Sequence, residues 1–484
     1  MTFEELLNLV SSDNPPGICI DSRLVRNGDI FVAVKGTVCD GHDFIDQALA
    51  NGAKYIVCQR DDTQYTIHNT QYEIITVEDS AEAAGVLAQA SRGYPASQLT
   101  NLAVTGTNGK TTVAYLVCSA IRAAGPKCGL IGTIIYDTGS ATSQAILTTP
   151  DCLAIAETQQ QMVKAGSKYM VVEASSHALS QNRLAGIDFK AAAFTNLAGD
   201  HLDYHKTKED YLAAKTKLFF ALSPDATAVL NKQSPEAKHI AEKTKAKILW
   251  YAVDEPADIS AHIESMDING TRFSILDNRF SSSIEVSTPL LGRYNVSNHL
   301  AAAGLCLAVG FDLQTIAAGL SALQAIPGRL EKVDWQGDFS VFIDYAHTDD
   351  ALRNVLATLK PLCHGRLIVV FGCGGDRDRT KRPRMARVAE QLADFIVVTS
   401  DNPRTERPED IINETIAGFE NPDSEKITVE TDRRKAIELA IKTARKNDIV
   451  LIAGKGHETY QIIGTQKFDF SDKVIAEQFL RRRE

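Results

Sequence analysis

The chain has 484 residues, of which 44% are hydrophobic, and a formal net charge of −10 at pH 7. A chain of this length can form roughly three globular domains of ordinary size. Its acidic balance argues against a general nucleic-acid binder, because binding a phosphate backbone requires an excess of Lys and Arg, although local basic clusters can still hold phosphates.

The cysteine pattern and the first residues favour a cytoplasmic location. Nine cysteines are scattered along the chain without a C-x-x-C pair, as expected for reduced thiols. The start, MTFEELLNLV, has Glu4 and Glu5 where a signal peptide would have basic residues. No apolar run approaches the length of about eighteen residues needed to cross a membrane, so we expect no membrane span.

The first 98 residues predict a small α/β domain. Short apolar strands alternate with helices up to about residue 77, and a helical run over 80–92 ends at the breaker Gly93-Tyr94-Pro95. Asp21-Ser22-Arg23 closes a strand, and the polar loop 36–44 contains two glycines. Both segments could hold a polar ligand, since open α/β sheets bind at their strand ends. Ordinary turn chemistry explains the same residues equally well.

The stretch NLAVTGTNGKTTV, residues 101–113, predicts a phosphate loop. A short apolar strand leads into a loop with Gly106 and Gly109, after which Lys110 and Thr111 open a helix. Backbone N–H groups, a helix N-terminus and an ammonium can together hold a polyphosphate, while the threonine hydroxyl reaches a metal ion. This favours ATP with Mg²⁺. Val104 occupies the place of the first glycine in the usual pattern, so a plain glycine turn before a helix remains the alternative.

Two segments after the phosphate loop carry further candidate groups. In LTTPD, a proline keeps Thr149 out of helical geometry, which makes the hydroxyls of Thr148 and Thr149 a candidate substrate clamp. The β-branched run KYMVVEASSHAL brings Glu173 to a strand end, before Ser175. A carboxylate at that position is expected to bind Mg²⁺, with a helix N-cap as the alternative.

The central region also contains a histidine cluster and an unusual lysine. FTNLAGDHLDYH places His201 and His205 among aspartates, which alone is more typical of a hydrogen-bonded turn than of a magnesium site. Lys215 lies beside alanines in a helical pattern, where burial would allow amine chemistry or carbamylation. A lysine that snorkels from an amphipathic helix is the commoner arrangement. Asn295 and Asn298 open an alanine-rich helix, either as caps or as amides that read a base.

After the breaker Ile326-Pro327-Gly328-Arg329, strands and helices alternate cleanly. FSVFID, RLIVVF, FIVVT and DIVLIAG are the expected strands, which predicts a doubly wound, mostly parallel sheet. Each strand is followed by a polar loop, and these loops carry Arg377, Arg404, Lys455 and Glu458. Such groups at one sheet edge favour an acidic or zwitterionic small-molecule ligand, with ordinary surface arginines as the alternative.

Several of these segments, in this order, resemble the Mur ligase family over nearly the whole chain. They are TGTNGKTT, EASSHAL, NLAGDHLDYH, YLAAK, GRYNVSNHLAA, IPGRLE, IDYAH, GCGGDRD, SDNPR and GKGHE. The resemblance implies an α/β protein with three domains. These are a small UDP-sugar-binding domain over 1–98, a central phosphate-loop ATP-binding domain with a parallel sheet over 99–328, and a C-terminal Rossmann-like, doubly wound amino-acid-binding domain over 329–484.

DSR with GDIFVA, and DNPR, are similar to the members of the family that add diaminopimelate. The resemblance implies an ATP-dependent ligase of peptidoglycan precursor synthesis. It would add meso-diaminopimelate to the D-glutamate of a UDP-muramoyl dipeptide through an acyl phosphate, as a cytoplasmic monomer with no nucleic-acid partner. Asp349 and Ala174 depart from the usual motifs, where proline and valine are common, and we expect neither to touch the chemistry.

Residue roles follow from the same resemblance. The implied catalytic residues are Lys110, Glu173, His201 and Lys215. The implied Mg²⁺ ligands are Thr111, Glu173, His201 and carbamylated Lys215. The implied ATP-binding residues are Gly106, Thr107, Asn108, Gly109, Lys110, Thr111, Thr112, Asn298, Arg329 and Asp344. Those for the muramoyl dipeptide are Ser22, Thr148, Thr149, Ser175, Gln181 and Arg183. Those for diaminopimelate are Arg377, Asp401, Asn402, Pro403, Arg404, Gly454 and Glu458.

Arg404 favours diaminopimelate over lysine, because lysine has no distal carboxylate for an arginine to pair. The competing functions are a folylpolyglutamate synthase, which would lack the uridine-binding domain, and a phosphate-loop switch that hydrolyses or only binds ATP without an acceptor. A scaffold with degenerate motifs is disfavoured, because the expected charged positions are filled. Family members close their domains over substrates, so the last domain can lie far from the phosphate loop in any one state.

Overall fold

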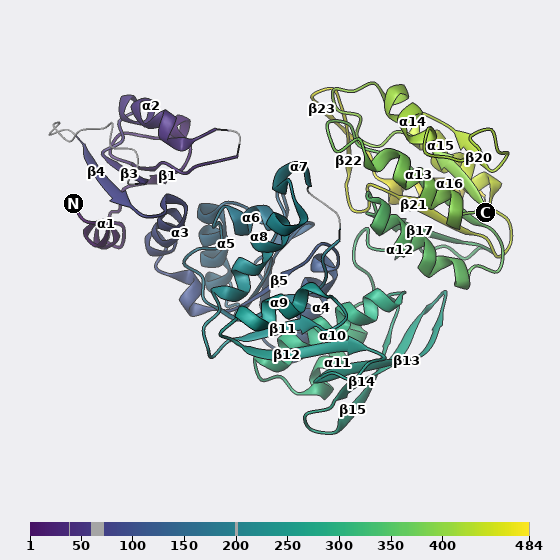
Figure 1. Cartoon of the computed structure of the whole chain (residues 1–484), viewed down its shortest axis with the longest axis horizontal. Coiled ribbons are helices and arrows are strands. Elements are labelled where there is room, and N and C mark those ends of the chain that lie inside the picture. Colours follow the sequence, from purple (N-terminus) through teal and green to yellow (C-terminus); the bar gives the residue numbers. More distant parts are fainter. Residues whose placement is uncertain (38, 60–71, 199–201, 484) are drawn as a thin grey trace.

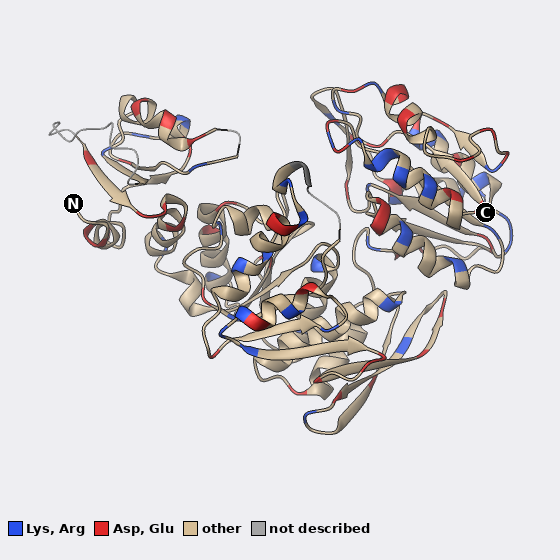
Figure 2. Cartoon of the chain, viewed as in Figure 1, with Lys and Arg blue, Asp and Glu red and all other residues tan. Residues whose placement is uncertain are grey.

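The structure is a computed structural model of the whole chain that describes residues 1–37, 39–59, 72–198 and 202–483. The strands of these described residues form four sheets. Figure 1 shows an N-terminal lobe at the left, a large central lobe, and a C-terminal lobe at the right. Figure 2 shows that each lobe carries both acidic and basic residues. In the described part of the chain, no helix has the length and apolar character needed to cross a membrane.

The N-terminal lobe is built on a four-stranded sheet in which every pair is parallel. Its strands are β1 (Ile18–Cys19), β2 (Ile30–Val32), β3 (Tyr55–Gln59) and β4 (Glu73–Val77). Its helices are α1 (Phe3–Val10), α2 (Ile45–Ala50) and α3 (Ser80–Ser91), with short 3₁₀ turns η1 (Ser22–Leu24), η2 (Gly41–Phe44) and η3 (Pro95–Gln98). Asp79 begins α3 by accepting two backbone N–H groups, which is why the helical run starts at Ser80.

The central lobe contains an eleven-stranded sheet in the order β15-β14-β13-β12-β11-β10-β5-β9-β6-β7-β8. The strands from β12 to β6 in this order are parallel. They are β5 (Thr100–Thr105), β6 (Cys128–Ile131), β9 (Tyr169–Glu173), β10 (Phe189–Phe194), β11 (Thr227–Asn231) and β12 (Lys247–Val253). Apart from exposed residues at the start of β12 and at Lys190 of β10, these strands are mostly buried apolar runs, as expected for a sheet covered on both faces.

Antiparallel strands extend this sheet at both ends. They are β7 (Ile135–Asp137) and β8 (Thr142–Gln144) at one end, and β14 (Gly270–Asp277) and β15 (Ser282–Thr288) beyond β13 (Ile259–Asp267) at the other. β13 itself pairs parallel with β12 and antiparallel with β14. The family resemblance implied a parallel sheet, and the antiparallel strands at its two ends were not predicted.

Helices cover both faces of the central sheet. One apolar core packs the sheet against α4 (Lys110–Ala123), α10 (Arg293–Ala308) and α11 (Leu313–Ala322). A second core uses the opposite face and includes residues of α5 (Cys152–Lys164), α8 (Lys208–Phe220) and α9 (Glu236–Lys243). The short helices α6 (Ser176–Ser180) and α7 (Leu202–His205) lie near α8. The position of β5 at the middle of the sheet places the phosphate loop at the centre of the lobe.

The C-terminal lobe has a six-stranded sheet in the order β16-β17-β21-β18-β19-β20. Its strands are β16 (Glu331–Lys332), β17 (Ser340–Asp344), β18 (Leu367–Phe371), β19 (Phe395–Val398), β20 (Ile427–Val429) and β21 (Ile449–Ala453). All pairs are parallel except β16 with β17. β17, β18, β19 and β21 are the four strands that the sequence predicts, and they are neighbours. Their polar loops therefore meet at one edge of the sheet.

Helices on both faces make the C-terminal sheet doubly wound, as predicted. One core contains residues of α12 (Asp349–Leu359), α13 (Lys381–Leu392) and α14 (Pro408–Ile416). The other contains residues of α15 (Arg433–Thr443) and α16 (Asp472–Arg481). A 3₁₀ turn η4 (Lys360–Leu362) follows α12, and a separate hairpin pairs β22 (Tyr460–Ile463) with β23 (Gln466–Asp469).

Candidate active site

A cavity of about 540 Å³ lies where the central and C-terminal lobes meet. Its central-lobe lining includes the phosphate loop, Glu173 and Lys215, and its C-terminal lining includes Arg329 and the segment 344–351. Both lobes therefore contribute side chains to one site.

The phosphate loop connects β5 to α4, and its glycines have backbone conformations that other residues rarely adopt. The φ angle is +144° at Gly106 and +90° at Gly109. A Cβ on Gly106 would lie 1.9 Å from the Thr195 hydroxyl oxygen, and one on Gly109 would lie 2.3 Å from the Asn298 amide oxygen. Glycine is required at both positions, because β10 and α10 bring polar groups directly against the loop.

Two lysines from different helices converge on the phosphate loop. Lys110 begins α4, and its Nζ donates to the carbonyls of Gly106 at 2.9 Å and Thr107 at 2.8 Å. Lys215 of α8 donates to the same Gly106 carbonyl at 2.8 Å and lies 4.4 Å from the centre of the Tyr211 ring. Lys215 is only 1% exposed, so the snorkelling arrangement is wrong. Its amine is held instead inside the cavity, next to the loop.

Glu173 ends β9 and is fully buried. Its Oε2 accepts from the hydroxyls of Thr111 and Thr133, each at 2.9 Å, and its Oε1 accepts from the Thr133 backbone N–H at 2.8 Å. Ser175 caps the following helix, so the N-cap alternative for Glu173 is wrong. A buried carboxylate beside two hydroxyl oxygens and a phosphate loop is a donor set of the kind that fits Mg²⁺.

Five of the six residues predicted for the dipeptide ligand lie near Glu173. Thr149 donates to the Glu173 carbonyl at 2.6 Å and to the Ser175 hydroxyl at 3.1 Å. Thr148 shares a hydrogen bond of 3.1 Å with Thr133. Arg183 donates to the Thr149 carbonyl at 2.8 Å and through two nitrogens to Gln181 Oε1. The sixth, Ser22, lies in the N-terminal lobe, where its hydroxyl donates to Gln47 at 2.8 Å.

The two asparagines of α10 are not helix caps, contrary to one of the two expectations. The helix begins at Arg293 after Gly292, so both side chains lie inside it. Asn295 Nδ2 donates to the Leu291 carbonyl at 2.7 Å, and Asn298 Nδ2 donates to Asn295 Oδ1 at 3.0 Å. Asn298 is thereby fixed against Gly109, and its proposed contact with a base remains a prediction.

Polar side chains connect the two lobes at the phosphate loop. Arg329 Nη2 donates to the Thr111 hydroxyl at 3.1 Å, and its guanidinium lies 4.7 Å from the centre of the Tyr345 ring. Asn108 Nδ2 donates to Asp350 at 3.0 Å. Asp344 is buried and accepts the backbone N–H groups of Leu330 at 2.6 Å and Ala346 at 2.7 Å. Desolvation by burial raises the pKa of the Asp344 carboxyl.

A second polar site lies at the edge of the C-terminal sheet, around Asn402. Its Oδ1 accepts from Lys455 Nζ and from the Ile462 backbone N–H, each at 3.0 Å, which orients its Nδ2 toward Glu458 at 2.8 Å. Lys455 is fully buried and donates to Glu458 at 2.9 Å. Gly454 has φ +118°, and a Cβ there would lie 2.7 Å from Asp401 Oδ2. The residues predicted to bind diaminopimelate thus lie in loops that follow the strands of one sheet.

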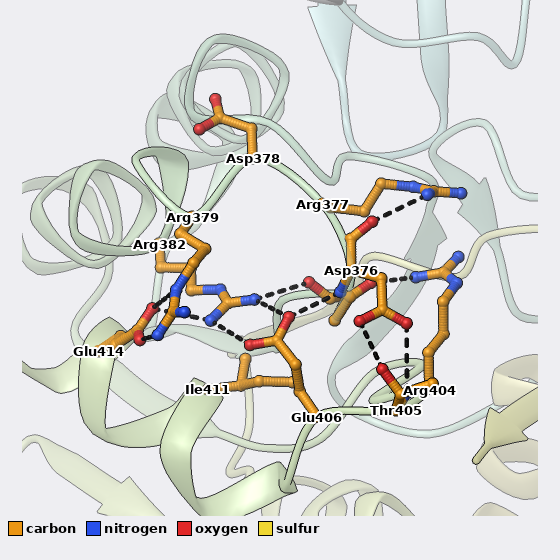
Figure 3. A network of polar contacts seen from close by, with 12 residues as sticks. Asp376, Arg377, Asp378, Arg379, Arg382, Arg404, Thr405, Glu406, Ile411 and Glu414 are labelled. Atoms are coloured by element: carbon orange, nitrogen blue, oxygen red, sulfur yellow. Dashed lines mark hydrogen bonds and ion pairs between the residues drawn. The ribbon is translucent and has the colours of Figure 1, made fainter. Parts of the chain in front are cut away.

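The two arginines predicted for this site are placed on neighbouring loops (Figure 3). Arg404 Nη1 donates to the Gly375 carbonyl at 2.8 Å, and Arg377 Nη1 donates to the Asp376 carbonyl at 3.0 Å. Pro403, which precedes Arg404, lies directly against Gly375. A Cβ added to Gly375 would be 1.9 Å from the Pro403 carbonyl oxygen. Both cations are held through backbone carbonyls.

Among the described residues, those predicted for diaminopimelate do not line the cavity at the phosphate loop. His457, next to Glu458 in the chain, reaches the cavity residue Tyr345, and the centres of the two rings are 5.1 Å apart. Desolvation by burial, with Arg329 the next largest cause, lowers the pKa of His457 to about 3. The imidazole is therefore neutral at this junction.

Some site groups were missed by sequence reasoning, and one lies outside the described residues. Thr133 was not predicted, although it follows the apolar strand β6 and a glycine, which is a strand-exit signal. Asn196 was also missed, and its Oδ1 accepts the Asn108 backbone N–H at 3.0 Å. His201, predicted as a metal ligand, lies outside the described residues. His205 is buried beside the rings of Tyr204 and Tyr211.

Three family models match the chain. The Mur ligase middle domain matches residues 104–306, the Mur ligase glutamate ligase domain matches 328–456, and the Mur ligase family catalytic domain matches 16–92. Curated relatives cover almost the whole chain. A UDP-N-acetylmuramoyl-L-alanyl-D-glutamate–2,6-diaminopimelate ligase from Geobacillus thermodenitrificans is 43% identical over 470 residues, which are 96% of this chain and 94% of the relative. One of the same name from Gloeobacter violaceus is 43% identical over 468 residues, with the same coverage.

Solved structures resemble this chain in fold. A structure of a UDP-N-acetylmuramoyl-L-alanyl-D-glutamate–2,6-diaminopimelate ligase has a TM-score of 0.67 at 33% identity and covers 100% of this chain and 99% of its own. A Mycobacterium tuberculosis folylpolyglutamate synthase has a TM-score of 0.60 at 19% identity and covers 76% of this chain and 91% of its own, a likeness of fold alone. Because the family models and the relatives together account for nearly its full length, the chain belongs to the Mur ligase family.

Proposed function

We propose that this protein is an ATP-dependent ligase that joins meso-diaminopimelate to the D-glutamate of UDP-N-acetylmuramoyl-L-alanyl-D-glutamate. The observation that carries the proposal is the identity of 43% to a ligase of that name over 96% of the chain. The phosphate loop of the central lobe and the arginine-bearing edge of the C-terminal lobe are the two sites that such a reaction needs.

The reaction would proceed in two steps. A carboxylate oxygen of the D-glutamate side chain bonds to the γ-phosphorus of ATP, the bond from that phosphorus to the β,γ-bridging oxygen breaks, and ADP leaves. The neutral amine of diaminopimelate then attacks the acyl carbon, phosphate leaves, and the nitrogen loses a proton. Lys110 and the backbone N–H groups of the phosphate loop would stabilise the negative charge of the transferring phosphoryl group.

Thr111 and Glu173 would hold a Mg²⁺ ion at the phosphate loop. The support is their oxygen-rich surroundings, in which Glu173 is buried and bonded to two threonine hydroxyls. A bound Mg²⁺ would neutralise phosphate charge. We also assign His201 and carbamylated Lys215 to a second metal site. The burial of Lys215 against the Gly106 carbonyl supports this, because a carbamate there would place oxygen atoms inside the cavity.

The nucleotide would contact the phosphate loop through Thr112 and its neighbours, with Asn298, Arg329 and Asp344 beside it. The hydroxyls of Thr148, Thr149 and Ser175, together with Gln181 and Arg183, would bind the muramoyl dipeptide, and Ser22 would bind near its uridine end. The hydrogen bonds that already connect this group to Glu173 support a single continuous site.

Arg404 would pair the distal carboxylate of diaminopimelate, while Asn402, Glu458 and the other residues of this edge orient its amino-acid ends. In the described residues, Arg404 Nε and Nη2 make no hydrogen bond, and a bidentate contact to a carboxylate requires two such N–H groups. Since this edge lies outside the phosphate-loop cavity, we propose that the C-terminal lobe moves toward the central lobe during turnover.

We further propose domain boundaries near residues 98 and 328, a monomeric state and a cytoplasmic location. The boundaries are supported by the intervals of the family models, which end at 92, resume at 104 and resume again at 328. The acidic composition supports small-molecule substrates over nucleic acid.

The test is phosphate release from ATP with the UDP-muramoyl dipeptide and, in separate reactions, diaminopimelate, lysine or ornithine. We expect release to require both substrates and to be fastest with diaminopimelate. Equal release without the dipeptide would instead identify a phosphate-loop switch.

A further inference from the structure

Arg382 and Arg433 are the two largest fully buried side chains of the described residues, and nothing in the proposed reaction uses Arg382. Arg382 lies in the first turn of α13, which directly follows the loop that carries Arg377. In the sequence it belongs to the basic run KRPRM, which resembles an exposed helix start. A guanidinium removed from water requires charged partners, so its surroundings indicate its role.

Arg382 bridges two carboxylates (Figure 3). Its Nη1 donates to Glu406 at 3.0 Å and to Glu414 at 2.7 Å, and its Nη2 donates to Glu406 at 2.7 Å. Nη2 also reaches the Gly374 carbonyl at 3.4 Å. Glu414 is in turn paired with the exposed Arg379. Two arginines and two glutamates thus form a charge-balanced cluster.

Glu406 connects this cluster to the loop that follows β18. One of its oxygens accepts the backbone N–H of Asp376 at 2.6 Å. The hydrogen bonds from Arg382, with a smaller contribution from Asp376, lower the pKa of Glu406 to about 2. The carboxylate therefore stays charged at any physiological pH and fixes the backbone directly before Arg377.

The same loop is bonded to the segment that carries Arg404. Gly375 N donates to the Asn402 carbonyl at 2.9 Å, and the Asp376 carboxylate accepts from the Thr405 hydroxyl at 2.8 Å and from its backbone N–H at 3.2 Å. Arg404 Nη1 closes the contact at the Gly375 carbonyl. The position of the Arg404 guanidinium therefore depends on where the Gly374–Asp376 backbone lies.

Both loops contain a non-glycine residue in the left-handed region. The φ angle is +53° at Asp376 and +51° at Arg404. Such conformations persist only where the surrounding contacts hold them, and they gather at ligand sites. Here the contacts that hold Asp376 are those of Glu406 and Thr405.

We propose that Arg382 and Glu406 are positioning residues that set the guanidinium of Arg404 for the distal carboxylate of the acceptor amino acid. This inference rests on the proposed function, because it assigns a specificity role within the diaminopimelate site. Arg382 holds Glu406, Glu406 holds Asp376, and the Gly375–Asp376 backbone holds Arg404. None of the described contacts places Arg382 or Glu406 at the acceptor itself.

The primary test variant is Glu406→Gln, which keeps the shape of the side chain and removes its charge. We expect the KM for diaminopimelate to rise about 10-fold, because a misplaced binding group weakens a bidentate contact. The KM values for ATP and the dipeptide and the kcat should stay within about 2-fold. Arg382→Lys, which keeps the charge but loses the planar fork, should give the same split.

The matched control is Arg379→Gln. Arg379 pairs with Glu414 of the same cluster and has a side chain that is 64% exposed. Its described hydrogen bonds are to Glu414 and not to Glu406, on whose pKa its charge has only a small effect. We expect all of its kinetic constants to stay within about 2-fold of the parent.

A double-mutant cycle tests whether Glu406 acts through Arg404. In an Arg404→Ala background, Glu406→Gln should raise the diaminopimelate KM by less than about 2-fold further, because the group it positions is gone. A full, multiplicative rise in that background would overturn the inference. So would a uniform loss in all three KM values together with a lowered thermal midpoint, which would indicate a role in the fold alone. Failure of the parent enzyme to use diaminopimelate would refute the proposed function instead.

Discussion

Two regions are proposed to meet substrates: the phosphate loop of the central lobe, called here the phosphate end, and the polar loops around Asn402 and Arg404 in the C-terminal lobe, called here the acceptor edge. The cations proposed to bind substrates there are held differently from the fully buried arginines of the C-terminal lobe. Lys110 and Arg404, which are proposed to meet substrates, are held through backbone carbonyls. Arg382 and Arg433, which are fully buried, are held by carboxylates, the latter by Asp472 at 2.6 Å. A backbone carbonyl orients a cation but leaves its charge uncompensated. A carboxylate orients the cation and also neutralises its charge.

These hydrogen-bond partners help to recognise a ligand-binding cation in a chain with 51 Lys and Arg residues. Arg404 retains its full charge for an anionic ligand, because its described hydrogen-bond partners are neutral carbonyls. The positive charge of Arg382 is neutralised by the carboxylates of Glu406 and Glu414, to which it is hydrogen-bonded. The pattern of partners separates binding from positioning more clearly than burial does, since Lys215 and Lys455 are buried as well.

The largest loss of activity is expected at the phosphate end. We expect Lys110→Met to lower ligation by about 10³-fold, because removal of one preorganised donor to a transferring group costs on the order of 10² to 10³ in rate. The measurement is acceptor-dependent phosphate release at saturating ATP, with thermal melting as the control for folding. Retention of more than a tenth of the rate would show that this lysine is only a structural part of the loop.

At the acceptor edge we expect a smaller loss of activity, which affects the use of diaminopimelate but not the binding of ATP. Arg404→Ala should reduce kcat/KM for diaminopimelate by about 100-fold, or about 2.7 kcal/mol, because one carboxylate of the ligand loses its partner. ATP binding, measured by calorimetry, should change little. If both fell equally, Arg404 would not belong to a separate acceptor site.

The smallest effect concerns pH and stability. Burial lowers the pKa of His299, in the core of the central lobe, to about 4. Between its ordinary pKa of about 6.5 and that value, only the unfolded chain binds this proton, so stability falls as the pH is lowered through this range. Glu406, with its pKa lowered to about 2, loses its contribution only below its ordinary value of 4.5.

Urea unfolding at pH 7 and pH 5 measures this difference. The parent should lose up to about 2 kcal/mol more than His299→Gln over this interval, because a shift of one pKa unit corresponds to about 1.4 kcal/mol. His457 acts in the same direction in both proteins, so its effect cancels in the comparison. Equal pH slopes would show that His299 is not kept neutral by the fold.

Much of the fold could be predicted from the sequence, because its signals are local. The buried runs that became β17, β18, β19 and β21 are apolar and β-branched, and the helices between them end at polar or breaker residues. The antiparallel strands β14 and β15 were missed. Their residues alternate between buried and exposed, which is a weaker local signal than a continuous apolar run.

The candidate site divides in the same way. The phosphate loop was predictable because glycine, lysine and threonine act there through neighbouring backbone groups. The place of Asn298 against Gly109 was not predictable, because Asn298 lies in α10 and Gly109 in the phosphate loop, far apart in the chain. Thr133 was missed for a similar reason, since its bond to Glu173 joins the ends of two strands.

The local pattern of residues was enough to predict the alternating strands and helices of the C-terminal lobe, the start of α4 at Lys110, and the polar loops that follow the C-terminal strands. The burial of Arg382 between Glu406 and Glu414, and the connection of this cluster to Arg404 through the backbone at Gly375 and Asp376, depend on the three-dimensional fold. The reason is that local patterns depend on residues a few positions apart. The partners of a buried charge, in contrast, are set by which strand exits meet in space.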